Sequence, residues 1–282
     1  MSIRLELPPT LRDRIEAASH PLIGLWACAG SPVTTEILAG SGCDWVLLDA
    51  EHSPNGLESV LAQLYAMSAY PATPVVCPPS GDAVIIKQFL DLGAQNLLVP
   101  MVDSAEQAAE IVRAVRYPLS GVRGVGSALA RSARWNRVEG YLARARETIS
   151  LTVQIESTAA VADVERIVAV DGVDAIFVGP ADLAASMGLL GQQQHPAVVE
   201  AVLHSISAAL AAGKPAGVNA FVSADADRYI AAGASFVAVG ADVAILARQT
   251  EALVDRFAAH AVVGLRRGGV GEDPDPAAHH SY

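Results

Sequence analysis

Two carboxylates, Glu156 and Asp182, follow neighbouring apolar runs in the middle of the chain. If the runs are adjacent parallel strands, both side chains lie at the same edge of the sheet. Gln154 precedes Glu156 by two residues and shares its face, because side chains alternate along a strand. Hard cations such as Mg²⁺ and Mn²⁺ take carboxylate oxygens in an octahedral shell with room for water and substrate. The pattern predicts a divalent-metal site, although a helix N-cap at Asp182 or a solvated loop residue at Glu156 explains each carboxylate taken alone.

A candidate general base stands at the end of an earlier apolar run. The sequence there reads Asp49-Ala50-Glu51-His52. An imidazole beside a carboxylate can move protons near neutral pH, because the carboxylate fixes its tautomer and stabilises its charged form. A single loop histidine is more often a surface residue, so this hypothesis needs support from other features.

The elements that must position these residues are short runs rich in Val, Ile and Leu, alternating with longer helical patterns. Continuous apolar strands are typical of a parallel sheet covered on both faces, and their alternation with helices indicates repeated βα units. We expect eight strands and a (β/α)8 barrel, with the active site at the carboxyl ends of the strands. The predicted strands are Leu22–Trp26, Trp45–Asp49, Pro74–Cys77, Asn96–Val99, Leu151–Glu156, Ala175–Val178, Ala216–Ala220 and Phe236–Val239.

Glycines recur just before several of these strands, at Gly42, Gly93, Gly172 and Gly233. Glycine at a helix C-terminus adopts the left-handed conformation at little cost, so the repeat marks the end of each helix. A doubly wound open sheet is the alternative architecture. Eight units in 282 residues favour the closed barrel.

Two segments fall outside the repeat. Residues 121–136 are glycine-rich and basic, and we expect a long, functional βα connection there. Residues 1–262 should form one barrel domain, and residues 263–282, rich in Gly, Asp, Pro and His, a disordered tail. His279 and His280 lie in that tail and are predicted to be solvated rather than metal ligands.

Composition narrows the functional class. A net charge of −11 disfavours nucleic acid and anionic membranes as partners. No apolar run reaches the roughly 18 residues of a membrane span, and the N-terminus lacks the apolar centre of a signal peptide. Cys28, Cys43 and Cys77 have no paired spacing, which argues against a zinc cluster or a disulfide framework and fits a reducing compartment. We therefore expect a soluble, cytoplasmic protein.

Taken in order, the motifs resemble those of the metal-dependent pyruvate aldolases of the 4-hydroxy-2-oxoheptanedioate aldolase family, whose relatives include 2-keto-3-deoxy-sugar-acid aldolases. The resemblance covers about residues 20–260. The matching segments are GLW at Gly24–Trp26, DWVLLDAEH at Asp44–His52, GAQNLLVPMV at Gly93–Val102, RGVGSALARSARWN at Arg123–Asn136, VQIE at Val153–Glu156, GVDAIFVGPADL at Gly172–Leu183 and FVAVG at Phe236–Gly240.

The resemblance implies a lyase of the phosphoenolpyruvate/pyruvate barrel type, acting in the catabolism of aromatic compounds or sugar acids. It implies that Glu156 and Asp182 bind Mg²⁺, Mn²⁺ or Co²⁺ and that the metal stabilises a pyruvate enolate. Gln154 and the backbone N–H of Ala181 resemble positions that hold pyruvate. His52 paired with Asp49 resembles the catalytic base. The resemblance also implies a homohexamer in which neighbouring subunits complete each site.

Three further residues are candidates for binding substrate. Trp26 ends the first strand and would form either a pocket wall or core. Ser127 belongs to Gly124-Val125-Gly126-Ser127, whose glycines either let the backbone approach an anion or merely permit turns; it is not a Walker phosphate loop. Asn219, at the end of the seventh strand, would help to select the aldehyde.

Cys77 is the main departure from the family, which has an arginine at this position to contact the keto oxygen. Cysteine offers no fixed cationic group, and the loss of one charged stabiliser often costs on the order of 3 kcal/mol, about a hundredfold in rate. The leading hypothesis is an aldolase that cleaves 4-hydroxy-2-oxo acids to pyruvate and an aldehyde. The alternatives are an acyl-CoA lyase of the citramalyl-CoA or malyl-CoA type, with a basic entrance at Arg131, Arg134 and Arg137, or a degenerate barrel that binds a keto acid without turnover.

Overall fold

The computed structural model describes residues 4–267 and contains a closed barrel of eight parallel strands, each paired with the next and the last with the first. The barrel prediction is confirmed, and the open doubly wound sheet is wrong. The strands are β1 (Leu22–Ala27), β2 (Trp45–Asp49), β3 (Thr73–Cys77), β4 (Asn96–Val99), β5 (Ser150–Ile155), β6 (Ala175–Val178), β7 (Ala216–Asn219) and β8 (Phe236–Ala241).

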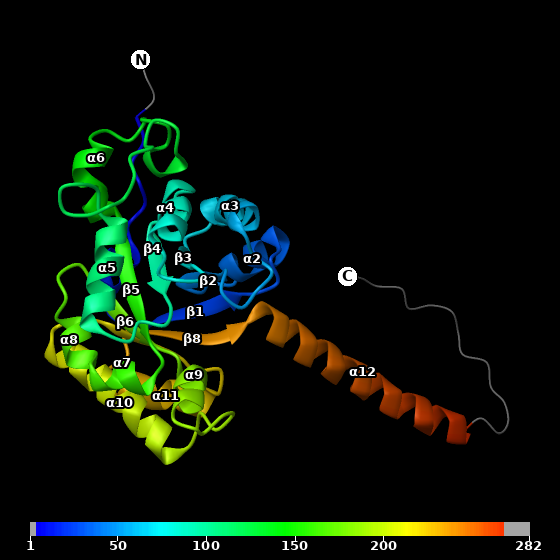
Figure 1. The fold of residues 1–282 in the computed structure, drawn as a ribbon. Helices are drawn as coiled ribbons and strands as arrows, with labels where there is room; N and C mark the ends of the chain where they lie inside the picture. The colour runs from blue at the N-terminus through cyan, green and yellow to red at the C-terminus, as the bar shows by residue number, and fades with distance from the viewer. Residues whose placement is uncertain (1–3, 268–282) are drawn as a thin grey trace. The chain divides into compact units, whose positions relative to one another are not determined.

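Helices surround this barrel, as Figure 1 shows for α2 to α5 and α8 to α11. The helices are α1 (Leu11–Ala17), α2 (Pro32–Ala39), α3 (Leu57–Ala66), α4 (Ala83–Asp91), α5 (Ala105–Val115), α6 (Tyr141–Arg144), α7 (Thr158–Ala162), α8 (Val164–Val168), α9 (Pro180–Ser186), α10 (Pro196–Ala211), α11 (Ser223–Ala231) and α12 (Asp242–Arg267). Short 3-10 turns occupy Met67–Ala69, Arg131–Ala133 and Ala145–Thr148.

Alternation along the strands divides the core into two apolar clusters. Val46, Leu48, Val153 and Ile155 belong to the larger cluster, which also contains the inner faces of the helices. Strand residues of the opposite parity form a smaller cluster inside the barrel. Because strands covered on both faces need apolar residues at nearly every position, the continuous runs in the sequence follow directly from this architecture. The inward cluster contains Leu22, Trp45, Leu47, Val75, Cys77, Leu98, Ala175, Phe177, Phe236 and Ala238.

We call the part of the barrel interior near the start of the strands the lower half, and the part near their carboxyl ends the upper half. Three aromatic rings fill the lower half. The ring centroids of Trp45, Phe177 and Phe236 lie 5.7–6.1 Å apart, in tilted or edge-on pairs. Two glycines make the room: a Cβ at Gly24 would lie 2.0 Å from the Trp45 ring, and one at Gly217 would lie 2.4 Å from Phe236. Helix α1 closes this end, with Leu11 buried in the same cluster.

The four repeated glycines behave as the sequence predicts. Gly42, Gly93, Gly172 and Gly233 all have φ between +92° and +104°, in the left-handed region that favours glycine. Each therefore ends a helical segment and turns the chain into the next strand. This local device returns the chain to the start of a strand at the same end of the barrel each time.

The segment 121–136 is placed differently from the prediction. It follows α5 and precedes β5, so it is a connection from a helix to a strand and lies at the end of the barrel where strands begin. Arg123 is fully buried and pairs with Asp91 at the end of α4 over 3.0 Å. The prediction of a βα connection was wrong because the length and composition of a loop do not reveal which end of the barrel it occupies.

Within residues 4–267 the chain divides into two compact units, with the boundary between Val243 and Ala244. The first contains the whole barrel. Helix α12 begins at Asp242 and continues to Arg267, beyond the predicted domain end at residue 262. Among residues 4–267, no helix is long and apolar enough to cross a membrane. His279 and His280 and most of the predicted tail lie outside the described residues.

Candidate active site at the barrel mouth

Polar side chains occupy the inward positions where the strands end. Val153 and Ile155 pack outward in the larger core cluster, while Gln154 and Glu156 contact each other on the inner face, as alternation predicts. The polar residues that end β2, β5 and β7 therefore lie together at the carboxyl end of the barrel, which we call the mouth, as the sequence predicts. The inward residues there are Trp26, Asp49, Cys77, Gln154, Glu156 and Asn219.

Glu156 is the most strongly perturbed carboxyl group of the mouth. It is 3 % exposed and accepts hydrogen bonds from the Met101 N–H at 2.6 Å and from the Gln154 amide. Burial, and then the nearby charges of Glu51 and Asp182, raise the pKa of Glu156 to about 7, although the Met101 N–H favours the charged form. Gly179 leaves the necessary space, since a Cβ there would lie 2.8 Å from the Glu156 carboxylate.

Met101 is a site residue that sequence analysis did not identify. It has φ 55° although it is not glycine, a conformation that costs about 1–3 kcal/mol and that clusters at functional sites. Its N–H donates to Glu156, and its carbonyl accepts from the Gln107 side chain at 2.8 Å. No local signal reveals this role, because it depends on the backbone after β4 meeting a side chain at the end of β5.

Besides Asp49, three carboxylates of the mouth, Glu51, Glu156 and Asp182, are close enough for their charges to affect one another. Asp182 is the third residue of α9 and is exposed. Its charge raises the pKa of both Glu51 and Glu156. For Glu51 burial is the largest cause of a raised pKa, and the His52 charge opposes it. Glu51 stood in the sequence beside His52 but was not predicted as a site residue; its adjacency to a histidine was the available signal.

Asp49 and His52 do not form a side-chain pair in this structure. Asp49 is 2 % exposed, and its carboxylate accepts from the backbone N–H groups of Glu51 and His52 and from the Ser53 hydroxyl. The His52 Nε2 instead lies 3.7 Å from a carboxylate oxygen of Glu51, and its side chain is 67 % exposed. The predicted pairing is corrected for this state: Asp49 fixes the loop backbone, and Glu51 is the carboxylate beside the imidazole.

Cys77 faces the interior with Val75, as alternation predicts. It is fully buried, and its Sγ lies 3.5 Å from a carboxylate oxygen of Glu51. Burial, and then the charges of Glu51 and Asp49, raise the pKa of the Cys77 thiol well above its usual value. A protonated thiol among carboxylates is neither an activated nucleophile nor a cationic clamp.

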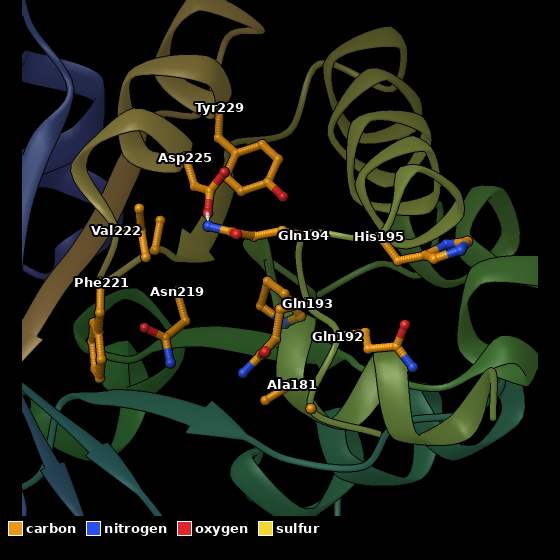
Figure 2. Close-up of a pocket in the computed structure, with 13 residues that line it drawn as sticks. Ala181, Gln192, Gln193, Gln194, His195, Asn219, Phe221, Val222, Asp225 and Tyr229 are labelled. Atoms are coloured by element: carbon orange, nitrogen blue, oxygen red, sulfur yellow. Dashed lines mark hydrogen bonds between the residues drawn. The ribbon is translucent and has the colours of Figure 1, made fainter. Parts of the chain in front are cut away.

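A cavity of about 560 Å³ opens beside the mouth (Figure 2). Ala181, Asn219 and Phe221 line it, and the Phe221 ring meets Trp26 edge-on at 6.4 Å between centroids. The Trp26 Nε1 and the Asn219 Oδ1 are buried without a hydrogen-bond partner, as is the Gln154 Oε1. Buried polar atoms in native proteins nearly always have partners, so these three indicate places for a ligand or water.

Ser127 and the basic segment lie elsewhere. Ser127 is buried in the connection 121–136, where the neighbouring Gly126 lies close to Asp91. Arg131 donates to the Leu92 carbonyl at the same end of the barrel. Within one chain, therefore, Ser127 does not join the mouth, and the arginines that an acyl-CoA entrance would need are turned to the opposite end.

The carboxylates of the mouth do not make a complete metal site by themselves. Among residues 4–267 no group of three or more His, Cys, Asp and Glu side chains is arranged to hold a metal ion. Glu156 and Asp182 alone would leave most positions of an octahedral shell open to water and substrate, as Mg²⁺ commonly requires. The donor set fits a catalytic cation better than a structural one.

Comparison with known proteins identifies the family. Residues 22–248 match the family model of the HpcH/HpaI aldolase/citrate lyase family. The chain is 52% identical over 241 residues to hydroxypyruvate/pyruvate aldolase of Deinococcus radiodurans, covering 86% of this chain and 87% of that protein. It is 50% identical over 242 residues to 4-hydroxy-2-oxo-heptane-1,7-dioate aldolase of Salmonella arizonae, covering 86% and 92%.

A solved structure agrees with these matches. An HpcH/HpaI aldolase/citrate lyase family protein from Burkholderia cenocepacia J2315 superposes with a TM-score of 0.84 at 39% identity, covering 88% of this chain and 98% of that chain. The barrel, the polar mouth and the sequence matches all indicate the same family. The chain belongs to the HpcH/HpaI aldolase/citrate lyase family and is an aldolase, an enzyme that cleaves and forms carbon–carbon bonds.

Proposed function

We propose that this aldolase depends on a divalent metal and cleaves 4-hydroxy-2-oxo acids to pyruvate, or a related 2-oxo acid, and an aldehyde. The observation that carries the proposal is the buried Glu156, beside Asp182 and Glu51, with a pKa raised to about 7. A buried carboxylate is costly unless it is paired. No lysine or arginine at the mouth is paired with Glu156 among its described contacts, so the site fits a cation supplied from solution.

Glu156 and Asp182 are the residues that would hold this cation, with Mg²⁺, Mn²⁺ and Co²⁺ as the candidates. When bound, the metal supplies Lewis-acid polarisation of the keto group, which makes the adjacent methyl protons more acidic. The Met101 N–H and the Gln154 amide orient the Glu156 carboxylate. These contacts fix its direction before substrate arrives, and the strain at Met101 is consistent with that role.

Gln154 and Ala181 are proposed to bind the 2-oxo acid. The Gln154 Oε1 is buried without a partner. Ala181 is the second residue of α9, where backbone N–H groups have no partner within the helix. A 2-oxo acid offers only acceptor oxygens, so the Ala181 N–H is the proposed donor to it, while the Gln154 Oε1 would accept from a water or from the hydroxyl of a 4-hydroxy-2-oxo acid. Trp26 and Asn219 are proposed to contact the rest of the substrate from β1 and β7.

His52 is proposed to carry the proton of the reaction, with Glu51 as its carboxylate partner. The imidazole is exposed enough to exchange protons with solvent, and its Nε2 lies 3.7 Å from a carboxylate oxygen of Glu51. Asp49 acts through the backbone of residues 51 and 52, so it is a positioning residue. Loss of Asp49 would then misplace Glu51 and His52 together.

Ser127, a homohexameric assembly and a cytoplasmic location remain predictions. Ser127 contacts no mouth within its own chain, so a role in substrate binding requires the mouth of another copy. Sedimentation equilibrium of the full chain would measure the number of subunits. An unchanged KM in a Ser127→Ala variant would show that Ser127 does not bind substrate.

The decisive experiment strips metal from the purified protein, restores Mg²⁺, Mn²⁺ or Co²⁺, and follows pyruvate release from 4-hydroxy-2-oxo acids, with Cys77→Arg in parallel. We expect metal-dependent release that the arginine raises by about a hundredfold, because it restores a charged stabiliser. Activity only in the arginine variant would favour a barrel that has lost turnover. No release from either protein, with metal demonstrably bound, would contradict the proposal.

A further inference from the structure

Most buried or partly buried arginines of this protein have a carboxylate partner. Arg12, Arg116 and Arg123 each lie 3.0–3.1 Å from an aspartate oxygen. Arg131 and Arg134 are also partly buried, yet among residues 4–267 no aspartate or glutamate forms an ion pair with either guanidinium. A charge removed from water is costly unless it is paired, so these two arginines indicate a place for an anion.

The two guanidinium groups lie side by side. A Cβ at Gly93 would lie 2.7 Å from the Nη1 of Arg131 and 2.9 Å from the Nη1 of Arg134, so glycine leaves the space that both groups occupy. Arg131 donates to the Leu92 carbonyl at 3.0 Å and lies over the Tyr65 ring, 4.7 Å from its centroid. Burial, and then the charge of Arg134, lower the pKa of Arg131. Both groups nevertheless stay charged at neutral pH, because arginine does not lose its proton in proteins.

The backbone after Arg131 holds the pair in place. Arg134, Trp135 and Asn136 have φ of 49°, 54° and 61°, in the left-handed region, although none of them is glycine. This conformation is costly for a residue with a Cβ and clusters at functional sites. The N–H of Arg134 donates to the Arg131 carbonyl at 2.9 Å, and that of Trp135 donates to the Ala130 carbonyl at 3.2 Å. The arginine pair is therefore fixed by a closed turn.

Arg131 and Arg134 line a cavity of about 610 Å³. Thr73 and Asn96, the first residues of β3 and β4, also line it, so the cavity lies at the end of the barrel opposite the mouth. Arg14 adds a third positive charge, and the acidic residue of the described lining is the exposed Glu6. A volume of this size suits a small organic ligand. Apolar side chains supply part of the wall: Leu7, Pro9, Leu64 and Met67.

Two adjacent guanidinium groups match a phosphate ester better than a carboxylate. A phosphate monoester carries a charge of about −1.5 to −2 at pH 7 and three strong acceptor oxygens. A carboxylate carries one charge on two oxygens. Guanidinium groups present paired N–H donors that fit the oxygens of a phosphate group. The apolar wall would then contact the organic part of the ester.

We propose that this cavity binds a small organic phosphate monoester and that Arg131 and Arg134 hold its phosphate group. The site lies at the opposite end of the barrel from the mouth, so the inference does not depend on the reaction proposed there. The bound phosphate would remove the repulsion between the two guanidinium groups. It would also stabilise the segment 121–136, to which both arginines belong.

The test is calorimetric titration of the full chain with glycerol 3-phosphate, at about 0.1 M salt to screen weak surface attraction. Butyrate and glycerol are the comparison probes, the first with a carboxylate and the second without charge. We expect glycerol 3-phosphate to bind at least tenfold more tightly than butyrate, and Arg134→Gln to weaken its binding at least tenfold. Arg116→Gln removes a partly buried arginine that is paired with Asp171, and this matched control should leave the affinity unchanged.

Melting temperatures separate a ligand site from a purely structural pair. Glycerol 3-phosphate should raise the Tm of the unaltered protein but not that of Arg134→Gln. Arg131→Lys keeps the charge and loses the paired donors, so it should bind the probe at least tenfold more weakly, and it carries the test if Arg134→Gln does not fold.

Three results would overturn the proposal. Equal affinity for butyrate would refute the phosphate class. Undiminished binding by the folded arginine variants would place the phosphate elsewhere on the protein. No binding by the unaltered protein at millimolar probe would refute the site itself.

Discussion

The lower and upper halves of the barrel interior are built on the same eight strands and the same inward alternation, yet they differ in almost every physical property. The lower half holds Trp45, Phe177 and Phe236, all fully buried and packed ring against ring, and the Trp45 Nε1 donates to the Leu22 carbonyl. The upper half holds Glu156 and Gln154, where charges and hydrogen-bonding atoms lack their full set of partners.

This difference indicates that the lower half stabilises the fold, while the upper half carries the functional groups. The lower half is an apolar cluster of buried side chains, and glycines at positions 24 and 217 leave the space that its rings occupy. The upper half keeps a strained backbone at Met101 and a buried carboxyl with a raised pKa. Such features persist at functional sites because the surrounding structure holds them in place. Substitutions in the two halves should therefore affect different measurements.

Phe236→Ala should produce the largest loss of stability. Removal of a fully buried ring leaves a cavity against Trp45 and Phe177, and we expect the free energy of unfolding to fall by about 3–5 kcal/mol. The kcat/KM of the folded fraction should change by less than about threefold, because the mouth is untouched. Urea unfolding measures the first quantity, with exposed Leu129→Ala as the control, expected within about 0.5 kcal/mol. A large loss of kcat/KM in the folded protein would contradict the separation between a stabilising lower half and a functional upper half.

Glu156→Gln should have the opposite profile. The amide keeps the shape and the acceptor for the Met101 N–H but removes the charge proposed to bind metal. We expect kcat/KM to fall by about 10²–10³, equivalent to about 3–4 kcal/mol, with weaker metal binding by calorimetry and no loss of stability in chelator. Glu58→Gln on exposed α3 is the control. Unchanged metal affinity in the Glu156 variant would contradict its proposed role.

The metal-free protein should become more stable as the pH falls from 8 to 6. The pKa of Glu156 is about 7 in the folded chain and near its ordinary value of 4.5 when unfolded, so between these values the folded state binds the extra proton. Charged Glu156 thus destabilises the fold above pH 7, by at most about 3 kcal/mol, and protonation relieves this below pH 7. Melting temperatures in chelator at both pH values measure the effect.

Two controls sharpen the pH comparison. Saturating metal should reduce the difference between pH 6 and pH 8, because the cation replaces the proton at the carboxylate. Glu156→Gln should reduce it in the absence of metal. If the variant and the unaltered protein show the same difference, other groups cause it and the raised pKa of Glu156 does not contribute.

The smallest expected signal comes from the thiols. Burial raises the pKa of Cys28 to about 12, and burial also raises the pKa of Cys43 and Cys77. At pH 8 the thiolate fraction of Cys28 should be roughly 10⁻⁴. We expect native protein to react with a disulfide reagent at least 100-fold more slowly than glutathione, and all three thiols to react in guanidinium. Rapid labelling of Cys77 with loss of activity would reopen a nucleophilic role.

The sequence by itself determined the barrel and the residues at its mouth. Apolar runs locate all eight strands, and left-handed glycines mark the turn into four of them; both signals are local. The parity of Gln154, Glu156 and Cys77 followed from alternation alone. These predictions needed no knowledge of which distant residues meet.

Tertiary structure decided what those residues touch. The contact of Met101 with Glu156, the partnership of His52 with Glu51 rather than Asp49, and the position of Ser127 at the opposite end all join segments far apart or depend on loop geometry. The cavity lined by Gln193 and Asn219 likewise exists only once β7 and the loop before α10 are side by side. Burial, strain and cavity shape arise from the packing of the whole chain, and no local pattern encodes them.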